Sequence, residues 1–255
     1  MIRCDQYPIL EFDSNRDAII NPSEFGTKHG EFISDKLVIT FFKDVISTLL
    51  DEGKMEIYKV LHGENDVVIY KFRDDDVLLM HGVIGCAATG GFLDELTGVG
   101  INKVMFCGGG GVLDHSIEVG ELFVVDGAIR DEGFSYHYIA PSRIIYANSD
   151  VCRTIYRHLD SKSIPYTHGI TWTTDAFYRE TKDKVALRKS EGARIVEMEQ
   201  SGCIAVSEFR GIKYGAIIYG GDDVSGEKWD SRNWHSRKGV RYSLVALCHD
   251  LVKII

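Results

Sequence analysis

The chain has 255 residues, of which 44% are hydrophobic, and a formal net charge of −9. This length fits one large domain or two small ones, and we expect a single domain over residues 1–255, because no Pro/Ser-rich linker or low-complexity segment divides the chain. The acidic balance argues against nucleic acid or an anionic membrane as the main partner. An anionic substrate would therefore need a local positive pocket.

The cysteines point to a reducing compartment. Six are present, at positions 4, 86, 107, 152, 203 and 248, with no C-x-x-C pair and no zinc-ligand spacing, so we expect no metal centre. Residues 1–6 lack the apolar stretch of a signal peptide, and no run reaches transmembrane length. We therefore expect a cytoplasmic protein without a membrane partner.

The first third of the chain predicts mostly strands. Residues 17–21 predict a short strand stopped by Pro22, and Ser34 is expected to cap a helix that runs to about residue 51, because apolar residues recur there at helical spacing. Three strand-like runs follow at 55–61, 67–72 and 77–84. Their connections are too short for crossovers, which predicts an antiparallel meander. Residues 87–99 predict a helix.

The stretch from residue 103 to 113 is the most informative part of the sequence. An apolar run predicts a buried parallel strand, which then meets the four glycines Gly108, Gly109, Gly110 and Gly111. Glycine accepts positive φ and a close approach to its backbone. We expect the strand to end in a glycine turn whose bare N–H groups suit an anion or a sugar hydroxyl. A tight turn without a ligand is the alternative.

The remaining chain alternates strands with helices. Strands are predicted at 121–129, 166–173, 194–197 and 213–219, and helices at 149–159, 182–192, 198–209 and 233–253. This alternation predicts an α/β fold with a mixed central sheet flanked by helices.

Two pairs of carboxylates fall at predicted strand ends. Glu197 and Glu199 flank Met198, and in an extended segment they would share one face and could meet a polyol or a water. The alternative is one solvated Glu and one Glu at the first turn of a helix. Asp222 and Asp223 follow an apolar strand and two glycines, where a neighbouring carboxyl should raise the pKa and suit a general acid. The alternative is an Asx turn or a helix cap.

Cations and aromatic rings also gather near predicted strand ends. Arg130 and Arg179 could bind phosphate or carboxylate, or could form salt bridges with their acidic neighbours. Rings that could stack on a planar ligand, or that could instead pack locally, are Phe134, Tyr136, His137, Tyr138, Phe177 and Tyr178. Because a sheet gathers its strand ends at one edge, all of these clusters could converge on one pocket.

Taken together, the clusters resemble those of the nucleoside phosphorylase superfamily, which holds hexameric purine nucleoside phosphorylases, uridine phosphorylases and methylthioadenosine-type nucleosidases. The resemblance spans residues 77–253 and is closest to a uridine-phosphorylase-like branch. It is carried by five segments in a specific order: 104–111, 130–138, Trp172-Thr173-Thr174-Asp175-Ala176-Phe177-Tyr178, Val196-Glu197-Met198-Glu199, and Tyr219-Gly220-Gly221-Asp222-Asp223.

The resemblance implies cleavage of an N-ribosidic bond. It places Met198 against the ribose, Glu199 on the 2′- and 3′-hydroxyls, and Asp222 or its neighbour Asp223 as the acid that protonates the leaving base. Substrate contacts are also expected from Glu197, Thr174, Phe177 and Tyr178. It implies a phosphate side lined by Gly108, Gly109 and Gly110, with no cofactor beyond inorganic phosphate as co-substrate, and a homo-oligomer from dimer to hexamer.

Three phosphate contacts of the family are missing from this sequence. The expected Gly-Asp-Pro-x-Arg loop matches residues 20–25, which hold no arginine; Phe106 replaces an arginine, and Gly109 replaces a Ser or Thr. Either another cation such as Arg130 replaces these contacts, or phosphate is not the nucleophile. The hypotheses are thus a phosphorylase acting on a purine or pyrimidine nucleoside, a nucleosidase that uses water, and a nucleoside-binding protein without chemistry.

Overall fold

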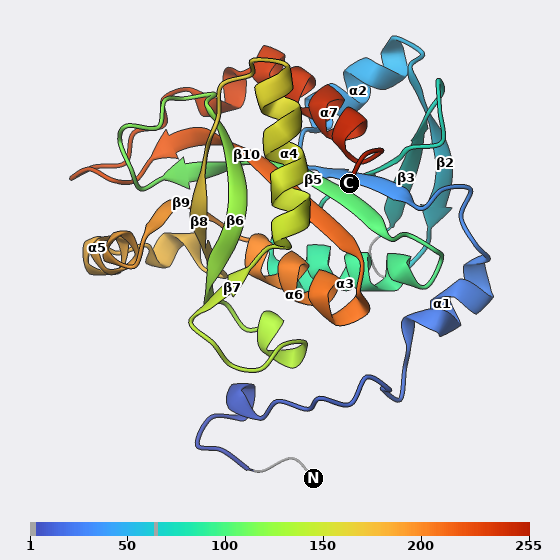
Figure 1. Cartoon of the computed structure of the whole chain (residues 1–255), viewed down its shortest axis with the longest axis horizontal. Helices are drawn as coiled ribbons and strands as arrows, with labels where there is room; N and C mark the ends of the chain where they lie inside the picture. Colours follow the sequence, from blue (N-terminus) through green and yellow to red (C-terminus); the bar gives the residue numbers. More distant parts are fainter. Residues whose placement is uncertain (1–3, 64–65) are drawn as a thin grey trace.

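The computed structural model describes residues 4–63 and 66–255. Ten strands of these residues form one mixed sheet. The N-terminal segment runs outside the body (Figure 1), with a short 3-10 helix at Pro8–Leu10 and the helix α1 at Pro22–His29. The strand expected at residues 17–21 is absent. Its place before α1 is an irregular segment, because Pro22 opens the helix and Glu24 accepts a hydrogen bond from the backbone N–H of Asn21.

The helix expected over residues 34–51 is a strand followed by a shorter helix. Strand β1 spans Lys36–Thr40 and helix α2 spans Lys43–Asp51. Leu37, Val38 and Ile39 are all fully buried, because β1 lies between two parallel strands and has a core on both faces. A strand that is buried on both faces has a continuous apolar sequence. In β1 this sequence also matches the spacing of apolar residues in a helix, which explains the wrong prediction.

The predicted meander is confirmed. Strands β2 (Met55–Leu61), β3 (Val67–Phe72) and β4 (Leu78–His81) pair antiparallel in sequence order. Part of the predicted connection between β2 and β3 lies outside the described residues. Helix α3 (Cys86–Thr97) follows as expected and leads into the central strand β5 (Lys103–Val112).

The four glycines belong to β5 rather than to a turn. Gly108 to Gly111 are all inside the strand, and none of them has a positive φ, so the expected glycine turn was wrong. Close packing explains the glycines instead. A Cβ atom at Gly110 would lie 2.5 Å from Cγ2 of Ile195 and 2.7 Å from the carbonyl oxygen of Val196. The glycines therefore let a neighbouring strand cross β5 at close range.

The second half of the chain closes the sheet on itself. Its strands are β6 (Leu122–Asp131), β7 (Ile144–Tyr146), β8 (Thr167–Thr174), β9 (Ala193–Glu197) and β10 (Lys213–Asp223). Strand β5 pairs with both β10 and β9, and the path β10–β6–β8–β9 completes a ring. Strand β7 was not predicted; it is a three-residue strand added to the side of β6.

Helices cover both faces of this sheet. Helices α3 and α6 (Gln200–Arg210) lie on one side, and α2, α4 (Ser149–Ser161) and α7 (Lys238–Leu251) lie on the other (Figure 1), each with its own hydrophobic core. Helix α5 (Lys182–Ser190) packs at the edge beside β9. Helix α7 begins five residues later than predicted, because Asn233 has a left-handed backbone and a 3-10 turn occupies Trp234–Ser236. No helix in the described ranges combines the length and the apolar character that a bilayer crossing needs.

Candidate functional site

The turn from β9 into α6 carries the two glutamates that the sequence singled out. Glu199 is buried, and one carboxylate oxygen accepts a hydrogen bond from the backbone N–H of Gly85 at 2.8 Å. Gly85 lies between β4 and α3, so this bond joins two loops that are 114 residues apart in sequence. Burial, and after it the charge of Glu197, raises the pKa of Glu199 to about 8. Met198 is partly exposed in the same turn.

Glu197 is used within the protein. Its carboxylate accepts hydrogen bonds from the hydroxyls of Thr171 (3.0 Å) and Thr173 (2.5 Å) and from the backbone N–H groups of Glu199 (2.6 Å) and Gln200 (2.7 Å). It therefore ties β8 to the start of α6, and burial raises its pKa to about 7. These four contacts occupy the acceptor positions that the substrate-binding prediction needed, so the geometry gives Glu197 a structural role and leaves Glu199 as the candidate sugar ligand.

Asp222 and Asp223 end β10 and serve different partners. Successive side chains of a strand point to opposite faces. Asp222 lies beside the glycine segment, with one carboxylate oxygen 3.5 Å from where a Cβ of Gly111 would be, and it accepts a hydrogen bond from the indole N–H of Trp229 at 2.6 Å. Its carboxyl group is thus held beside β5 and under the loop that follows β10.

Asp223 is buried beside His115. Its carboxylate is 2.5 Å from Nδ1 of His115 and accepts a hydrogen bond from the backbone N–H of Ser225 at 2.7 Å. Burial acts to raise the pKa of Asp223, but the bonds from Ser225 and His115 outweigh it and the pKa falls below its usual value. An acid with a lowered pKa is a poor proton donor, so Asp222 is the better candidate of the two.

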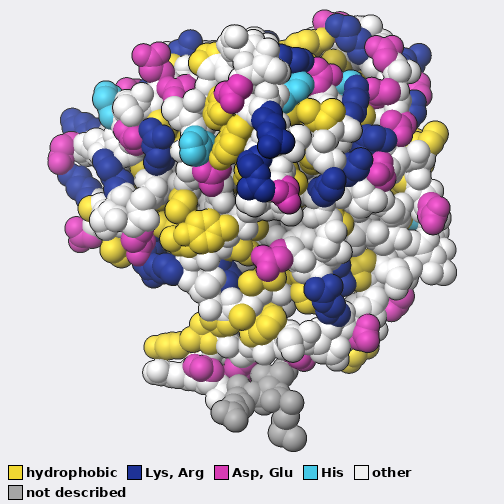
Figure 2. All heavy atoms as spheres, in the orientation of Figure 1, with side chains coloured by type: hydrophobic (Ala, Val, Ile, Leu, Met, Phe, Trp, Pro, Cys, Tyr) yellow, Lys and Arg dark blue, Asp and Glu magenta, His cyan; other side chains and the backbone are white. Residues whose placement is uncertain are grey.

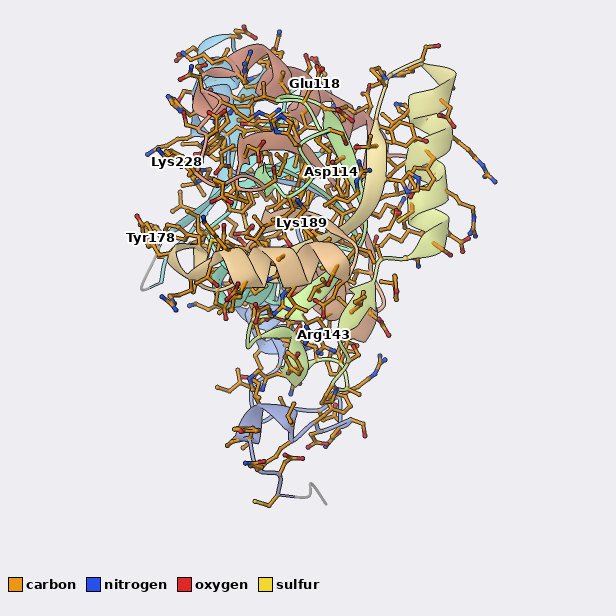
Figure 3. The ribbon with its side chains drawn as sticks, turned by 90° about the vertical axis from the view of Figure 1, so that its left-hand side faces the viewer. Asp114, Glu118, Arg143, Tyr178, Lys189 and Lys228 are labelled. Atoms are coloured by element: carbon orange, nitrogen blue, oxygen red, sulfur yellow. The ribbon has the colours of Figure 1, made fainter. Side chains whose placement is uncertain are left out.

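A cleft of about 790 Å³ opens between α5 and the loop that follows β10. Figure 3 shows Lys189 on α5, Tyr178 at the approach to that helix, and Lys228 on the loop above it. Residues that line the cleft include Glu180, Val185, Lys189, Val224, Lys228 and Trp229. Trp229 lines the cleft and also donates a hydrogen bond to Asp222, so the predicted acid lies next to one wall of the cleft.

Glu180 lines this cleft, whereas the sequence indicated it only as a possible salt-bridge partner of an arginine. Its side chain is partly exposed, and burial, followed by repulsion from Asp222, raises its pKa to about 7. The only sequence signal was its place at the end of the loop between β8 and α5. Trp229 gave no signal, because its contact with Asp222 depends on how the loop after β10 folds back.

The predicted base-enclosing rings are open to solvent in the single chain. Phe177 is 51% exposed and Tyr178 is 89% exposed, and their ring centroids are 4.1 Å apart. Thr174, at the end of β8, is buried, and its hydroxyl accepts a hydrogen bond from the backbone N–H of Ala176. This bond shapes the loop that carries both rings.

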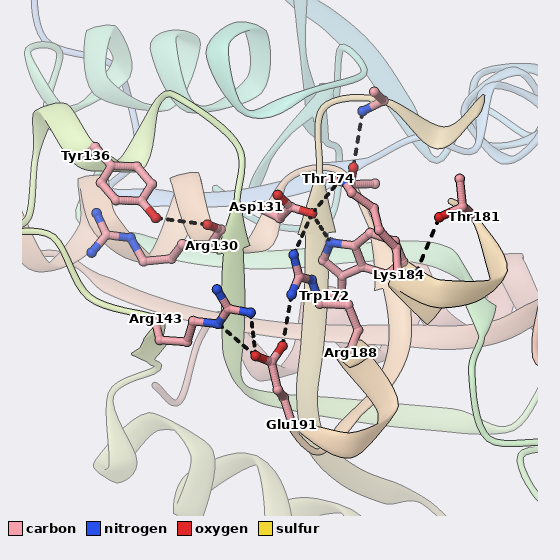
Figure 4. Close-up of polar contacts among 11 residues, drawn as sticks. Arg130, Asp131, Tyr136, Arg143, Trp172, Thr174, Thr181, Lys184, Arg188 and Glu191 are labelled. Atoms are coloured by element: carbon pink, nitrogen blue, oxygen red, sulfur yellow. Dashed lines mark hydrogen bonds and ion pairs between the residues drawn. The ribbon is translucent and has the colours of Figure 1, made fainter. Parts of the chain in front are cut away.

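Arg130 does not face an anion site. It is buried, and its guanidinium donates to Ser135 Oγ and Ser142 Oγ and to the carbonyl oxygens of Ile139 and Ala140. All of these acceptors are neutral oxygens, and among the described residues Arg130 forms no salt bridge with its acidic neighbours. The adjacent Asp131 instead binds Trp172, Lys184 and Arg188, which fastens α5 to β6 and β8 (Figure 4).

Aromatic side chains occupy the part of β1 and β5 where phosphate contacts were expected. The structure shows that residues 20–25 do not follow the first strand; the segment after β1 is Phe41-Phe42-Lys43, which also holds no arginine. The rings of Phe41 and Phe106 lie 5.3 Å apart, and Phe106 is 2% exposed. A Cβ at Gly108 would lie 3.1 Å from the Phe106 ring. The glycines predicted to hold phosphate, Gly108 to Gly110, are thus packed against side chains of β9, β10 and this aromatic pair.

A family model and several solved structures match this partly closed mixed sheet and its covering helices. The family model described as "Phosphorylase superfamily" matches residues 37–246, and the chain belongs to that family. The nucleoside phosphorylase-type resemblance and the mixed α/β fold are therefore confirmed.

The similar proteins include both phosphorylases and nucleosidases. A guanosine phosphorylase from Halorubrum lacusprofundi is 25% identical over 174 residues, 68% of this chain and 71% of the relative. Solved structures that share the fold include a uridine phosphorylase from Vibrio fischeri (TM-score 0.70, 20% identity, 87% of this chain and 92% of that one). An AMP nucleosidase from Bacteroides thetaiotaomicron is equally similar (TM-score 0.70, 20% identity, 86% and 87%).

Proposed function

We propose that this protein cleaves the N-ribosidic bond of a ribonucleoside and that water, rather than phosphate, accepts the ribosyl group. One observation carries the choice of water: the contact between Phe41 and Phe106 fills the strand ends where a phosphate ion would need cations. Arg130 is the cation that could have replaced the missing arginines, but its guanidinium donates hydrogen bonds to oxygen atoms inside the protein. A bound phosphate dianion beside apolar rings would be strongly disfavoured, whereas a water molecule would not.

The carboxylates supply the chemistry of this proposal. Asp222 donates a proton to the base as the bond from its nitrogen to C1′ breaks, and the base leaves neutral. Glu199 binds the ribose hydroxyls and, in its ionised form, stabilises the positive charge that develops on the sugar, as in glycoside hydrolysis. The oxygen of water then bonds to C1′, and its released proton returns to the Asp222 carboxylate. The products are free base and free ribose.

Phosphorolysis is the second candidate, and the sequence relatives favour it. The guanosine phosphorylase match covers more than two thirds of this chain. In that case inorganic phosphate would be the co-substrate, ribose 1-phosphate the product, and the anion would have to find donors other than Arg130.

Product analysis separates the two candidates. The purified protein would be incubated with guanosine, inosine, adenosine and uridine, in phosphate-free buffer and in buffer with inorganic phosphate. Equal base release in both buffers, with free ribose as the sugar product, supports hydrolysis. Release only with phosphate, with ribose 1-phosphate as product, overturns it in favour of phosphorolysis. Binding of nucleosides without any base release would refute both and leave a nucleoside-binding protein.

A further inference from the structure

Trp229 is a large aromatic residue that the fold leaves exposed at the cleft. It is 65% exposed, and it lines the cleft between α5 and the loop that follows β10. Among the described residues that line this cleft, it is the only aromatic one. Phe177 and Tyr178, the rings predicted to enclose the base, are not among them. The flat aromatic surface of the cleft is therefore a single indole, a bicyclic ring like a purine.

The backbone beside Trp229 is held by hydrogen bonds. The backbone N–H of Asp223 donates to the carbonyl oxygen of Asp230 at 2.8 Å, and the N–H of Asp230 donates to the carbonyl oxygen of Asp223 at 3.0 Å. The guanidinium of Arg232 donates to the carbonyl oxygen of Ile117 at 3.0 Å. These bonds tie the loop to the end of β10 and to the segment before β6. A stiff aromatic side chain on a held backbone loses little conformational freedom when a ligand binds.

The direction of the indole matters more than its exposure, because single exposed hydrophobic residues are common on protein surfaces. The indole N–H donates to the carboxylate of Asp222 at 2.6 Å, so the edge of the ring lies against the predicted acid. Val185 and Ala186 of α5 line the same cleft. A planar group placed on the indole would therefore lie within an apolar part of the cleft and close to the Asp222 carboxyl.

We propose that the base of the nucleoside stacks on the ring of Trp229, while the indole N–H of the same residue holds the Asp222 carboxyl at the edge of that base. This inference rests on the proposed function, because it gives the proposed acid its orientation. Trp229 binds the substrate through its ring and is a positioning residue through its nitrogen. Every base has a π face, so both purine and pyrimidine nucleosides use this surface.

Two substitutions separate the ring from the N–H group. Trp229→Phe keeps an aromatic surface but has no donor for Asp222, so kcat should fall by about tenfold while KM stays within about threefold. Trp229→Leu removes the aromatic surface as well, so the affinity for the base should also fall by roughly 10–100-fold. A residue that only supports the fold would not give this division between kcat and KM. Unchanged affinity in the Leu variant, or unchanged kcat in the Phe variant, overturns the double role.

Tryptophan fluorescence reports the stacking directly. The chain has three tryptophans, and a base on Trp229 should quench the emission of the wild type. Trp229→Phe should abolish this ligand-dependent change. Trp234→Phe is the matched control, because Trp234 belongs to the same loop region but packs against Arg241. This variant should keep the quenching, kcat and KM of the wild type. Emission that does not respond to a saturating base would contradict the stacking.

Binding of the free bases distinguishes failure of this inference from failure of the proposed function, because calorimetric titration with adenine and uracil needs no turnover. If no nucleoside is cleaved but Trp229→Leu weakens base binding, the proposed reaction fails and the stacking role stands. If turnover persists and this variant keeps the wild-type KM and base affinity, the stacking role is overturned and the proposed reaction stands. A wild type that binds neither base and cleaves no nucleoside would refute both. Thermal melting should show that each variant is folded.

Discussion

At the scale of single residues, the proposed chemistry depends most on Asp222, whose carboxyl group is bonded to Trp229 at the mouth of the cleft. We expect Asp222→Asn to lower kcat by about 10²–10⁴-fold, because an amide cannot donate the proton that the leaving base needs. Nucleoside affinity should stay within about threefold, because the amide oxygen still accepts from Trp229. Base release by chromatography and binding by calorimetry measure the two quantities.

Asp230→Asn is a suitable control for this experiment. Asp230 is an exposed residue of the same loop, and its carboxylate contacts the backbone N–H of Arg232. Turnover of this variant should equal that of the wild type. Undiminished turnover by the Asp222 variant would show that another group protonates the base.

Glu199 makes the stability of the fold depend on pH. Its pKa is raised to about 8 in the folded chain, so between pH ~4.5 and ~8 the native state binds more protons than the unfolded state. Stability contributed by the protonated form is therefore lost as pH rises through this window. Glu199→Gln removes the ionisation and keeps an acceptor for Gly85. We expect the variant to gain on the order of 3 kcal/mol over the wild type between pH 5.5 and pH 8.

Urea unfolding at the two pH values measures this difference. Glu208→Gln, on the outer part of the same helix, provides the comparison, because Glu208 is exposed. A wild-type free energy of unfolding that falls no more than that of the Glu199 variant would contradict the raised pKa.

At the scale of elements, the crossing of β5 and β9 depends on the absence of a side chain at Gly110. In Gly110→Ala the new methyl would meet a backbone carbonyl at 2.7 Å and Ile195 at 2.5 Å, so β9 would have to move. We expect the free energy of unfolding to fall by about 2–4 kcal/mol. Gly91→Ala in α3 is the matched control: nothing lies within 4 Å of its added Cβ, and it should be neutral or stabilising by up to ~1 kcal/mol.

Denaturant titration of both variants checks this prediction. Equal stabilities would show that the strands separate easily, and the packing explanation for the glycines would then be wrong. A shift of β9 in the Gly110 variant would also displace Glu197, because Glu197 ends β9 and accepts hydrogen bonds from the start of α6.

At the scale of the whole molecule, we expect one cooperative unfolding transition. Leu37 and Val38 are neighbours in β1, yet they belong to the two cores on opposite faces of the sheet. Loss of either core would remove support from the shared strands, so neither should unfold alone. Differential scanning calorimetry should give a calorimetric enthalpy equal to the van't Hoff enthalpy. Two resolved transitions would indicate separate domains.

The N-terminal segment leads us to expect a homo-oligomer. Ile19 is 100% exposed and Ile20 is 79% exposed, and hydrophobic side chains gather along this segment beneath the body (Figure 2). Such exposure is costly unless another chain covers it. Light scattering should give a mass of at least twice 28.6 kDa for the wild type, and the double variant Ile19→Asp/Ile20→Asp should shift it toward the monomer. A monomeric wild type would contradict this expectation.

The sequence by itself determined the fold class, the meander, most element boundaries from residue 86 onward, and the identity of the polar clusters. These features are local: apolar periodicity, glycine and proline positions, and strings of residues characteristic of the family. The helix α1 also has a local signal, because Asn21, Pro22 and Glu24 form a helix-start pattern.

Only the tertiary structure decided what each polar group does. Burial on both faces made β1 a strand, and the approach of β9 explained the glycines of β5. Hydrogen bonds from distant elements engage the carboxylate of Glu197 and the guanidinium of Arg130 within the protein, and burial, followed by repulsion from Asp222, raises the pKa of Glu180. Burial, pairing and pKa depend on neighbours far away in sequence, which is why the pattern of residues along one chain could name the candidates but not their roles.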